Sequence, residues 1–312
     1  MLLVATGVIV LAVVGGRSGA DSEVVPPVRA ISGPLSVAGC AKGREERQTR
    51  EFTLRLTRPE GVRTALVRVP ARAARTPSPL VVALHGGGAS GRFMKGYSGL
   101  APVSDGAAFT VVFPDATGPR RFWNLKATTG PDDVGFVEEL IQQVATVACV
   151  DPARVFAVGV SNGGGLAARI GCELSGRVAA IVVVAGGLRS LPACLPVRPV
   201  SVLEIHGTGD AAVPYAGDPN DGRAGAVRTW LAGWARRDRC AGPGPWHIVA
   251  PRSARIDWRG CAAGSTVAHI QVLGGGHQWP GASPPDPGPP STFSAARRTW
   301  AFLVRVRAPR AG

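Results

Sequence analysis

Continuous apolar runs recur along the middle of the chain. Each of them is four to seven residues long, and they cover Leu80–Leu84, Phe109–Phe113, Val155–Val158, Val178–Val184 and Val200–Ile205. Strands that are covered on both faces of a mostly parallel sheet have this pattern, because neither face meets water. The runs therefore predict the central strands of a parallel sheet.

The segments around these runs predict the rest of the fold. Apolar and polar residues alternate over Phe52–Thr57 and Val62–Val69 on either side of Pro59-Glu60-Gly61, which predicts an antiparallel hairpin. Helix-like stretches lie between the central runs and after the last strand, at Asp133–Val147, Asn162–Leu174, Gly225–Arg237 and Ser291–Val304, with a last strand at Val267–Leu273. This alternation predicts an α/β fold: a mostly parallel sheet with an antiparallel amino-terminal edge and helices on both faces.

Composition narrows the class of protein. The 312 residues are 45% hydrophobic and 18% charged, which excludes disorder for most of the chain. The net charge of +14 raises the question of a nucleic-acid partner. However, the basic residues are almost all arginines scattered along the chain, and no basic run is interleaved with aromatic residues. We therefore expect no nucleic-acid partner.

The amino terminus predicts export. Leu2–Val14 is apolar but too short for a stable membrane span, and Ser18-Gly19-Ala20 resembles a cleavage site, although the usual basic residues are missing. We expect an export segment at 1–20, a linker at 21–39 and a single domain at 40–308 of a secreted, extracellular protein. Val37-Ala38-Gly39-Cys40 also fits a lipobox, which leaves lipid attachment at Cys40 as the alternative.

Six cysteines in an exported chain predict three disulfides, for which sequence allows 15 connectivities. Local order favours Cys172–Cys194, which brackets a strand, and Cys240–Cys261, which brackets a hairpin-like segment. Cys40–Cys149 then follows by elimination. A metal site is the rival interpretation, but no cysteine or histidine spacing is typical of one, and we expect no metal.

A nucleophilic serine is indicated at Ser161. Gly159-Val160-Ser161-Asn162-Gly163 fits G-x-S-x-G, a short pattern that is weak alone. Here a buried strand precedes it and a helix-forming stretch follows it. This strand–turn–helix context is typical of a nucleophile elbow, in which a strained turn exposes the serine hydroxyl.

Two further residues complete a possible triad. His277 follows the last strand in Gly274-Gly275-Gly276-His277, and Asp210 follows an earlier strand in His206-Gly207-Thr208-Gly209-Asp210. The order serine, acid, histidine and the positions at strand ends both fit a hydrolase triad of Ser161, Asp210 and His277. Asp115 is a rival acid, but it precedes Ser161 in the chain.

Residues near these three are predicted to have supporting roles. In His85-Gly86-Gly87-Gly88, the N–H of Gly87, or second that of Gly88, is expected to form an oxyanion hole with the N–H of Asn162. Trp123 and Trp279 are candidates for lining the substrate pocket. The other histidines are expected to have no part in the chemistry: His85 and His206 pack, and nothing argues for His247 and His269. Asp132 or Asp133 is expected to cap the following helix.

The combined motifs resemble a known family, the secreted esterases of the polyhydroxybutyrate-depolymerase and feruloyl-esterase type. The matching segments are Leu84–Gly88, Phe113–Asp115, Asp132–Phe136, Cys149–Val155, Gly159–Gly164, His206–Asp210 with Val213–Tyr215, and Gly275–Gly281. The resemblance extends over roughly residues 40 to 304. Residues 165 and 166 depart from it, since many relatives have Met after the elbow and this chain has Gly165 and Leu166. The start Gly39-Cys40-Ala41-Lys42 resembles that of family members whose cysteine pairs as proposed for Cys40 and Cys149.

The resemblance implies an α/β-hydrolase fold and a serine esterase that forms an acyl-enzyme without a cofactor. It implies an ester substrate: a hydroxyalkanoate oligomer, a feruloyl or acetyl polysaccharide, or a small aryl ester. No polymer-binding module is recognisable, which favours soluble substrates. The alternatives are an acetylxylan or other small-ester esterase, a serine peptidase, and a non-catalytic surface protein on the same fold. The sequence makes no prediction of oligomeric state.

Overall fold

A computed structural model describes residues 33–36, 38–43, 47–126, 129–186, 194–218, 226–286 and 291–308. The predicted export segment at 1–20 and most of the predicted linker lie outside these ranges. At the end of the predicted linker, Ala38 and Gly39 form the start of a short helix, and Leu35 is buried in the core.

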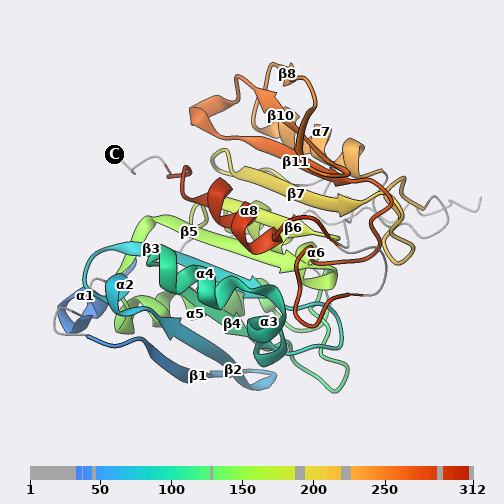
Figure 1. Ribbon diagram of the computed structural model, residues 1–312. Helices are drawn as coiled ribbons and strands as arrows, with labels where there is room; N and C mark the ends of the chain where they lie inside the picture. The colour runs from blue at the N-terminus through green and yellow to red at the C-terminus, as the bar shows by residue number, and fades with distance from the viewer. Residues whose placement is uncertain are drawn as a thin grey trace, which may run out of the picture.

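The core of the fold is one sheet of eleven described strands, ordered β1-β2-β4-β3-β5-β6-β7-β11-β10-β8, with β9 paired to β10 (Figure 1). The strands are β1 (Arg50–Arg58), β2 (Gly61–Val69), β3 (Ser78–Leu84), β4 (Thr110–Pro114), β5 (Val150–Val160), β6 (Ala180–Val184), β7 (Ser201–Gly207), β8 (Gly242–Pro243), β9 (His247–Ala250), β10 (Ser253–Arg259) and β11 (Val267–Val272).

The centre of the sheet is parallel, as the apolar runs predicted. Neighbouring strands from β4 to β11 run in the same direction, and every residue of β3, β4, β6 and β7 is buried. The predicted hairpin is present, with Arg58 opposite Gly61 across its turn. The opposite edge is also antiparallel, because β10 pairs with β11, β8 and β9. The sequence indicated only a hairpin-like segment between Cys240 and Cys261 at this edge and did not separate its three strands, of which β8 and β9 are short.

Helices cover both faces of the sheet (Figure 1). Side chains of α5, α6 and α7 pack into one buried cluster, and those of α3, α4 and α8 pack into another. Successive residues of β3 alternate between them, with Val82 in the first cluster and Val81 in the second. The helices are α1 (Ala38–Gly43), α2 (Ala71–Ala74), α3 (Gly91–Ser98), α4 (Leu100–Ala107), α5 (Asp133–Val147), α6 (Asn162–Glu173), α7 (Val227–Arg237) and α8 (Ala295–Leu303), with a 3₁₀ turn at Ala262–Gly264.

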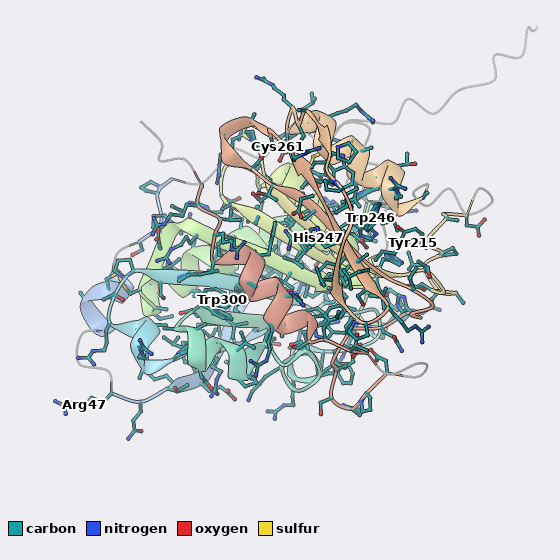
Figure 2. All side chains as sticks on the ribbon, turned by 45° about the horizontal axis from the view of Figure 1, so that its top comes forward. Arg47, Tyr215, Trp246, His247, Cys261 and Trp300 are labelled. Carbon is teal, nitrogen blue, oxygen red and sulfur yellow. A yellow bond between two sulfur atoms is a disulfide. The ribbon has the colours of Figure 1, made fainter. Side chains whose placement is uncertain are left out.

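The three predicted disulfides are present: Cys40–Cys149, Cys172–Cys194 and Cys240–Cys261, the last at the β10 end of the sheet (Figure 2). The first joins α1 to the segment that leads into β5. Because its Sγ is bonded to Cys149, Cys40 cannot carry a thioether-linked lipid. The lipobox interpretation is therefore wrong for the folded protein.

Candidate active site

Ser161 lies in a strained turn between β5 and α6. Its backbone has φ 55° and ψ −121°, a conformation that a residue with a side chain rarely adopts. The flanking glycines are required by close packing: a Cβ on Gly159 would collide with the backbone of Gly163, and one on Gly163 would collide with the carbonyls of Leu84 and His85. The turn therefore has the geometry of a nucleophile elbow, and it is pressed against the end of β3.

The structure brings the three predicted triad residues together. The Oγ of Ser161 lies 2.9 Å from Nε2 of His277, and Nδ1 of His277 lies 2.8 Å from Oδ2 of Asp210. Asp210 follows β7 and His277 follows β11, and these parallel neighbours end at the same edge as β5. The imidazole thus bridges a hydroxyl and a carboxylate in the geometry that activates a serine.

Asp210 is held in one orientation and in the ionised state. Its Oδ1 accepts hydrogen bonds from the backbone N–H groups of Ala212 and Val213, at 2.9 and 2.8 Å. Burial raises the pKa of Asp210, but hydrogen bonds from His206 and His277 outweigh burial and hold that pKa far below its usual range. The carboxylate is therefore negative wherever the enzyme is folded near neutral pH.

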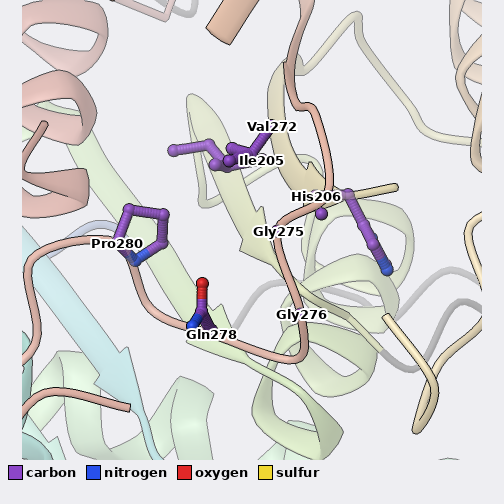
Figure 3. A pocket seen from close by; sticks show the side chains of 8 residues that line it. Ile205, His206, Val272, Gly275, Gly276, Gln278 and Pro280 are labelled. Atoms are coloured by element: carbon purple, nitrogen blue, oxygen red, sulfur yellow. The ribbon is translucent and has the colours of Figure 1, made fainter. Parts of the chain in front are cut away.

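A small cavity lies behind the turn that carries His277 (Figure 3). Its lining consists of Ile205, His206, Gly207, Val272, Gly275, Gly276, Gln278 and Pro280. None of the three triad residues lines this cavity, so it is a packing space under the turn. The candidate place for a substrate is instead beside the hydroxyl of Ser161, next to the loop that follows β3.

That loop is His85–Gly88, which follows β3. A Cβ on Gly86 would stand 3.6 Å from Cβ of Ser161, so the loop runs directly past Ser161. Gly88 donates its N–H to the carbonyl of Arg121 at 3.1 Å. This bond occupies the second candidate for the oxyanion hole and leaves Gly87 as the better one, together with the N–H of Asn162 at the start of α6.

His85 holds this loop, as expected. Its Nδ1 lies 2.6 Å from the carbonyl of Gly86, and its Nε2 accepts the N–H of Ala116 at 3.1 Å. Burial lowers the pKa of His85, which favours the neutral ring with its proton on Nδ1. A neutral imidazole satisfies both contacts, and neither nitrogen faces Ser161.

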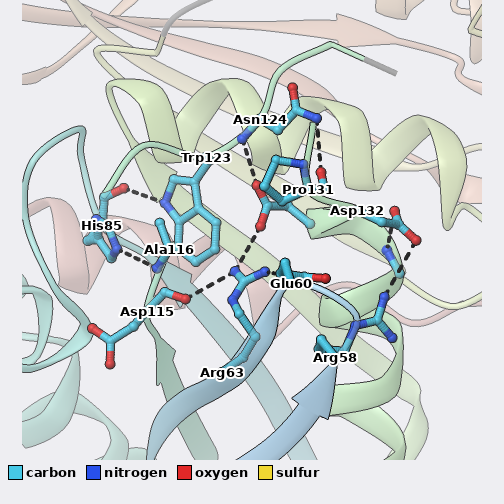
Figure 4. A network of polar contacts seen from close by, with 12 residues as sticks. Arg58, Glu60, Arg63, His85, Asp115, Ala116, Trp123, Asn124, Pro131 and Asp132 are labelled. Atoms are coloured by element: carbon cyan, nitrogen blue, oxygen red, sulfur yellow. Dashed lines mark hydrogen bonds and ion pairs between the residues drawn. The ribbon is translucent and has the colours of Figure 1, made fainter. Parts of the chain in front are cut away.

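A buried network around Arg63 holds the neighbouring segment 115–124 (Figure 4). The guanidinium of Arg63 bonds Oδ1 of Asp133 at 2.8 Å and the carbonyl of Asp115 at 3.1 Å, and Asp133 also accepts the N–H of Asn124 at 2.6 Å. Burial raises the pKa of Asp133, and the bonds from Asn124 and Arg63 oppose that rise. Asp132 caps α5 through the N–H of Gly135. The network fixes the segment 115–124 beside Ser161.

Asp115, the rival acid, belongs to this scaffold. Its carboxylate accepts hydrogen bonds from the hydroxyl of Thr64 at 2.7 Å and from the N–H of Gly91 at 2.9 Å. It therefore anchors the start of α3 to β2, and Asp210 is the acid that contacts His277.

The two tryptophans predicted to line the pocket are packing residues. Trp123 is 2% exposed, with its indole N–H bonded to the carbonyl of His85, and Trp279 is 1% exposed, with its indole N–H bonded to the carbonyl of Ser98. Both predictions are corrected: such side chains support loops and present no face to a substrate. The adjacent Phe122 is instead 54% exposed, and a Cβ on Gly87 would collide with its ring. No pattern in the sequence distinguishes the exposed Phe122 from the buried Trp123.

Three residues behind the triad were missed or dismissed. His206, expected only to pack, lies with Nε2 3.2 Å from Oδ2 of Asp210 and Nδ1 2.7 Å from Glu204. His269, for which nothing argued, lies with Nδ1 2.7 Å from the other oxygen of Glu204. A signal was present in the sequence, because Glu204 is a carboxylate inside a run that is otherwise almost entirely apolar.

Two further properties concern only the part of the chain that the structure describes. It contains no group of three or more His, Cys, Asp or Glu side chains that could hold a metal ion. None of its helices combines the length and apolar character needed to cross a membrane.

The sequence is similar to those of known esterases. Residues 63–204 match the family described as "Esterase PHB depolymerase". NocK of Nocardia uniformis subsp. tsuyamanensis, whose name gives it provisionally as an esterase, is 30% identical over 86% of this chain and 86% of its own. Feruloyl esterase D of Neurospora crassa is 30% identical over 67% of this chain and 66% of its own length. Feruloyl esterase B of Piromyces equi is 32% identical over 57% of this chain, a match that covers 35% of that enzyme.

A solved structure supports the fold. An acetyl xylan esterase from Aspergillus awamori superimposes with a TM-score of 0.59, over 81% of this chain and 99% of its own, at 16% identity. Together with the sheet order, this confirms the α/β-hydrolase fold.

Proposed function

From the premise that this chain belongs to the PHB-depolymerase and feruloyl-esterase family and is a carboxylic ester hydrolase, we propose that Ser161 attacks the substrate and carries the acyl group. The single observation that supports this most strongly is the pair of contacts from His277, 2.9 Å to Ser161 and 2.8 Å to Asp210.

The reaction proceeds in two halves. Nε2 of His277 accepts the proton of Ser161 as Oγ bonds to the ester carbonyl carbon, and the resulting oxyanion accepts N–H bonds from Gly87 and Asn162. The tetrahedral intermediate then breaks its bond to the alcohol oxygen, which takes the proton from His277. Water then attacks the acyl-enzyme in the same way. His277 accepts a proton from the water and returns it to Oγ of Ser161 as the carboxylic acid is released. Asp210 stabilises the imidazolium in both halves.

The test is a Ser161→Ala variant assayed on p-nitrophenyl acetate and butyrate, methyl ferulate and 3-hydroxybutyrate oligomers. We expect a folded protein whose kcat is lower by about five to six orders of magnitude. An unchanged melting temperature checks the fold. If the variant hydrolyses these esters at the wild-type rate, Ser161 has no part in the reaction.

We propose that Phe122 contacts the acyl or alcohol part of the substrate, because its exposed ring lies against the oxyanion glycine, Gly87. We propose three substrate classes. Feruloyl esters and acetylxylan esters are taken from the names of the relatives, and hydroxybutyrate oligomers from the description of the family. Phe122→Ala should raise KM for methyl ferulate about tenfold and raise KM for p-nitrophenyl acetate less. Ile248→Ala, which removes a 78% exposed side chain on edge strand β9, is the control. If the two variants changed KM for methyl ferulate equally, Phe122 would not contact the substrate.

We also propose that the protein is exported, with 40–308 as its catalytic domain. Three disulfides are typical of an oxidising compartment, and the apolar segment Leu2–Val14 resembles an export signal. Sequencing the amino terminus of the protein recovered from the culture medium of an expressing bacterium should give a start near residue 21. Full retention in the cytoplasm with free thiols would contradict export.

A further inference from the structure

A buried polar array continues from the triad into the sheet. We call Asp210, His206, Glu204, His269 and Tyr215 the histidine array. Glu204 and His206 lie on β7, His269 lies on the neighbouring β11, and Tyr215 follows Asp210 in the loop. Glu204, His206 and His269 are 0, 1 and 0% exposed, so each polar atom needs a partner inside the protein.

The contacts of His206 fix its protonation. Its Nδ1 lies 2.7 Å from Oε1 of Glu204, and its Nε2 lies 2.9 Å from the carbonyl of Val213 and 3.2 Å from Oδ2 of Asp210. Each ring nitrogen therefore faces only oxygen atoms. A neutral imidazole has one N–H and would turn a lone pair toward an oxygen, unless Glu204 itself carried a proton.

The other side of Glu204 indicates that it is ionised. Burial raises the pKa of Tyr215 to about 12, with the charge of Glu204 adding to the rise, so its hydroxyl keeps the proton that it can donate to Nε2 of His269 at 2.9 Å. Nδ1 of His269 then carries the ring proton, which it donates to the backbone carbonyl of Glu204 at 3.3 Å, and Nδ1 also lies 2.7 Å from Oε2 as an ion-pair contact. The carboxylate of Glu204 therefore accepts the N–H of His206 at Oε1 and has a second ring N–H beside Oε2, a setting that favours its ionised form.

We propose that His206 is a cationic positioning residue of the triad, whose N–H directs Oδ2 of Asp210 toward His277 while Glu204 cancels the charge of His206. This inference rests on the proposed function of Asp210 and His277. Without Glu204, a positive charge 3.2 Å from Asp210 would oppose formation of the imidazolium at His277. With Glu204, Asp210 keeps both its orientation and its net negative field.

Electrostatics agrees with this assignment. Burial lowers the pKa of His206, but the charge of Glu204 and the bonds to Asp210, Glu204 and Val213 outweigh it and raise the pKa to about 10. Burial also raises the pKa of Glu204, and the nearby His206 and His269 outweigh it and keep that pKa below its ordinary value. The remaining groups around His206 are the ring of Tyr215, with centroids 5.9 Å apart, and His277 beyond Asp210.

The direct test of protonation is NMR of the ring nitrogens in protein labelled with ¹⁵N-histidine. We expect one histidine with both nitrogens protonated from pH 6 to pH 9, and we expect His206→Gln to remove that signal. His247→Phe, which changes the exposed histidine of β9 (Figure 2), should leave it in place. A neutral His206 ring at pH 8 would overturn the proposal.

The test of positioning is kinetic. His206→Phe should lower kcat about 10- to 100-fold with little change in KM, because Asp210 loses a charge-assisted donor. The acid limb of the kcat/KM profile should move to higher pH, since removing the cation favours the protonated forms of Asp210 and His277. His206→Gln keeps a donor without the charge, so we expect it to restore most of kcat while the acid limb stays displaced.

The Ser161 and His206 variants distinguish a failure of the proposed function from a failure of the role proposed for His206. If Ser161→Ala keeps its activity, the proposed function fails. If Ser161→Ala is inactive and His206→Phe lowers kcat in proportion to the folded fraction, with an unmoved acid limb, then His206 is only structural and this inference fails alone.

Discussion

Two buried polar networks flank Ser161, and they are built from different chemistry. The histidine array lies at the ends of β7 and β11 and contacts His277 through Asp210. On the other side, the arginine network, defined as Glu60, Arg63, Asp115, Asn124 and Asp133, holds the segment that carries Phe122 (Figure 4). Both are hydrogen-bonded at similar distances, and both contain carboxylates buried in the protein.

The difference between them follows from the task on each side. Arginine keeps its charge in proteins, and its planar fork binds several oxygens in fixed directions. The arginine network therefore suits a loop that must stay still while N–H groups meet the oxyanion. Histidine gains and loses protons under ordinary conditions. The histidine array contacts His277 through Asp210, and His277 is where we propose that positive charge appears during the reaction, so the protonation of the array should affect the rate.

The largest expected effect is on kcat, and it distinguishes the two candidate acids, Asp210 and Asp115. Asp210→Asn should lower kcat by about 10⁴-fold, because the amide no longer stabilises the imidazolium and favours the wrong tautomer of His277. Asp115→Asn, the same change in the rival acid, alters a side chain that bonds Thr64 and Gly91 and should keep kcat within about tenfold. Steady-state kinetics of both variants at neutral pH checks this. A greater loss in Asp115→Asn would mean that the acid was assigned to the wrong network.

The next effect should appear in stability. Arg63→Met leaves Asp133 buried without its charged partner and should lower the free energy of unfolding by about 3–5 kcal/mol. Adding Asp133→Asn to that variant should recover part of the loss, since no unpaired charge then remains. Urea unfolding of both variants measures the difference. A loss below about 1 kcal/mol in Arg63→Met would show that the arginine network contributes little to the fold.

The smallest expected effect is a dependence of stability on pH. Of the two networks, only the histidine array should lose stability as the pH rises above neutral. The folded pKa of His206, about 10, lies above the ordinary value of 6.5. Its contribution to stability is therefore complete below about pH 6.5 and is lost as pH rises through about 10. The lowered pKa values of Asp210 and Glu204 have the opposite sign: their contribution is present above the ordinary values and is lost as the pH falls through the lowered ones.

Thermal melting of the wild type and of His206→Gln between pH 7 and pH 10.5 tests the alkaline side. We expect the wild type to melt a few degrees higher at pH 7 and the two curves to converge near pH 10. A constant difference across this range would show that His206 does not change its charge there.

The sequence predicted what depends on local patterns and chain order. The apolar runs located the central strands, and the spacing of glycine around Ser161, with Asp210 and His277 after later strands, located the triad that the structure assembles. Motif context worked because the ends of parallel strands meet at one edge of the sheet.

What the sequence missed depends on contacts between distant segments. Trp123 and Phe122 are adjacent, and only the folded loop shows that the first is buried and the second exposed. Glu204 and His269 pair across two strands that are 65 residues apart in the chain. The second antiparallel edge was indicated only as a hairpin-like segment between Cys240 and Cys261, because β8 and β9 are too short to show alternation.

The central claim is that Ser161 carries the acyl group, and trapping that intermediate tests it most directly. The enzyme is mixed with p-nitrophenyl butyrate, quenched in acid within milliseconds, and digested for mass spectrometry. We predict one butyryl group per chain, on the peptide that contains Ser161, and no adduct in Ser161→Ala. A butyryl group on another residue, or rapid hydrolysis in a Ser161→Ala protein, would contradict the account.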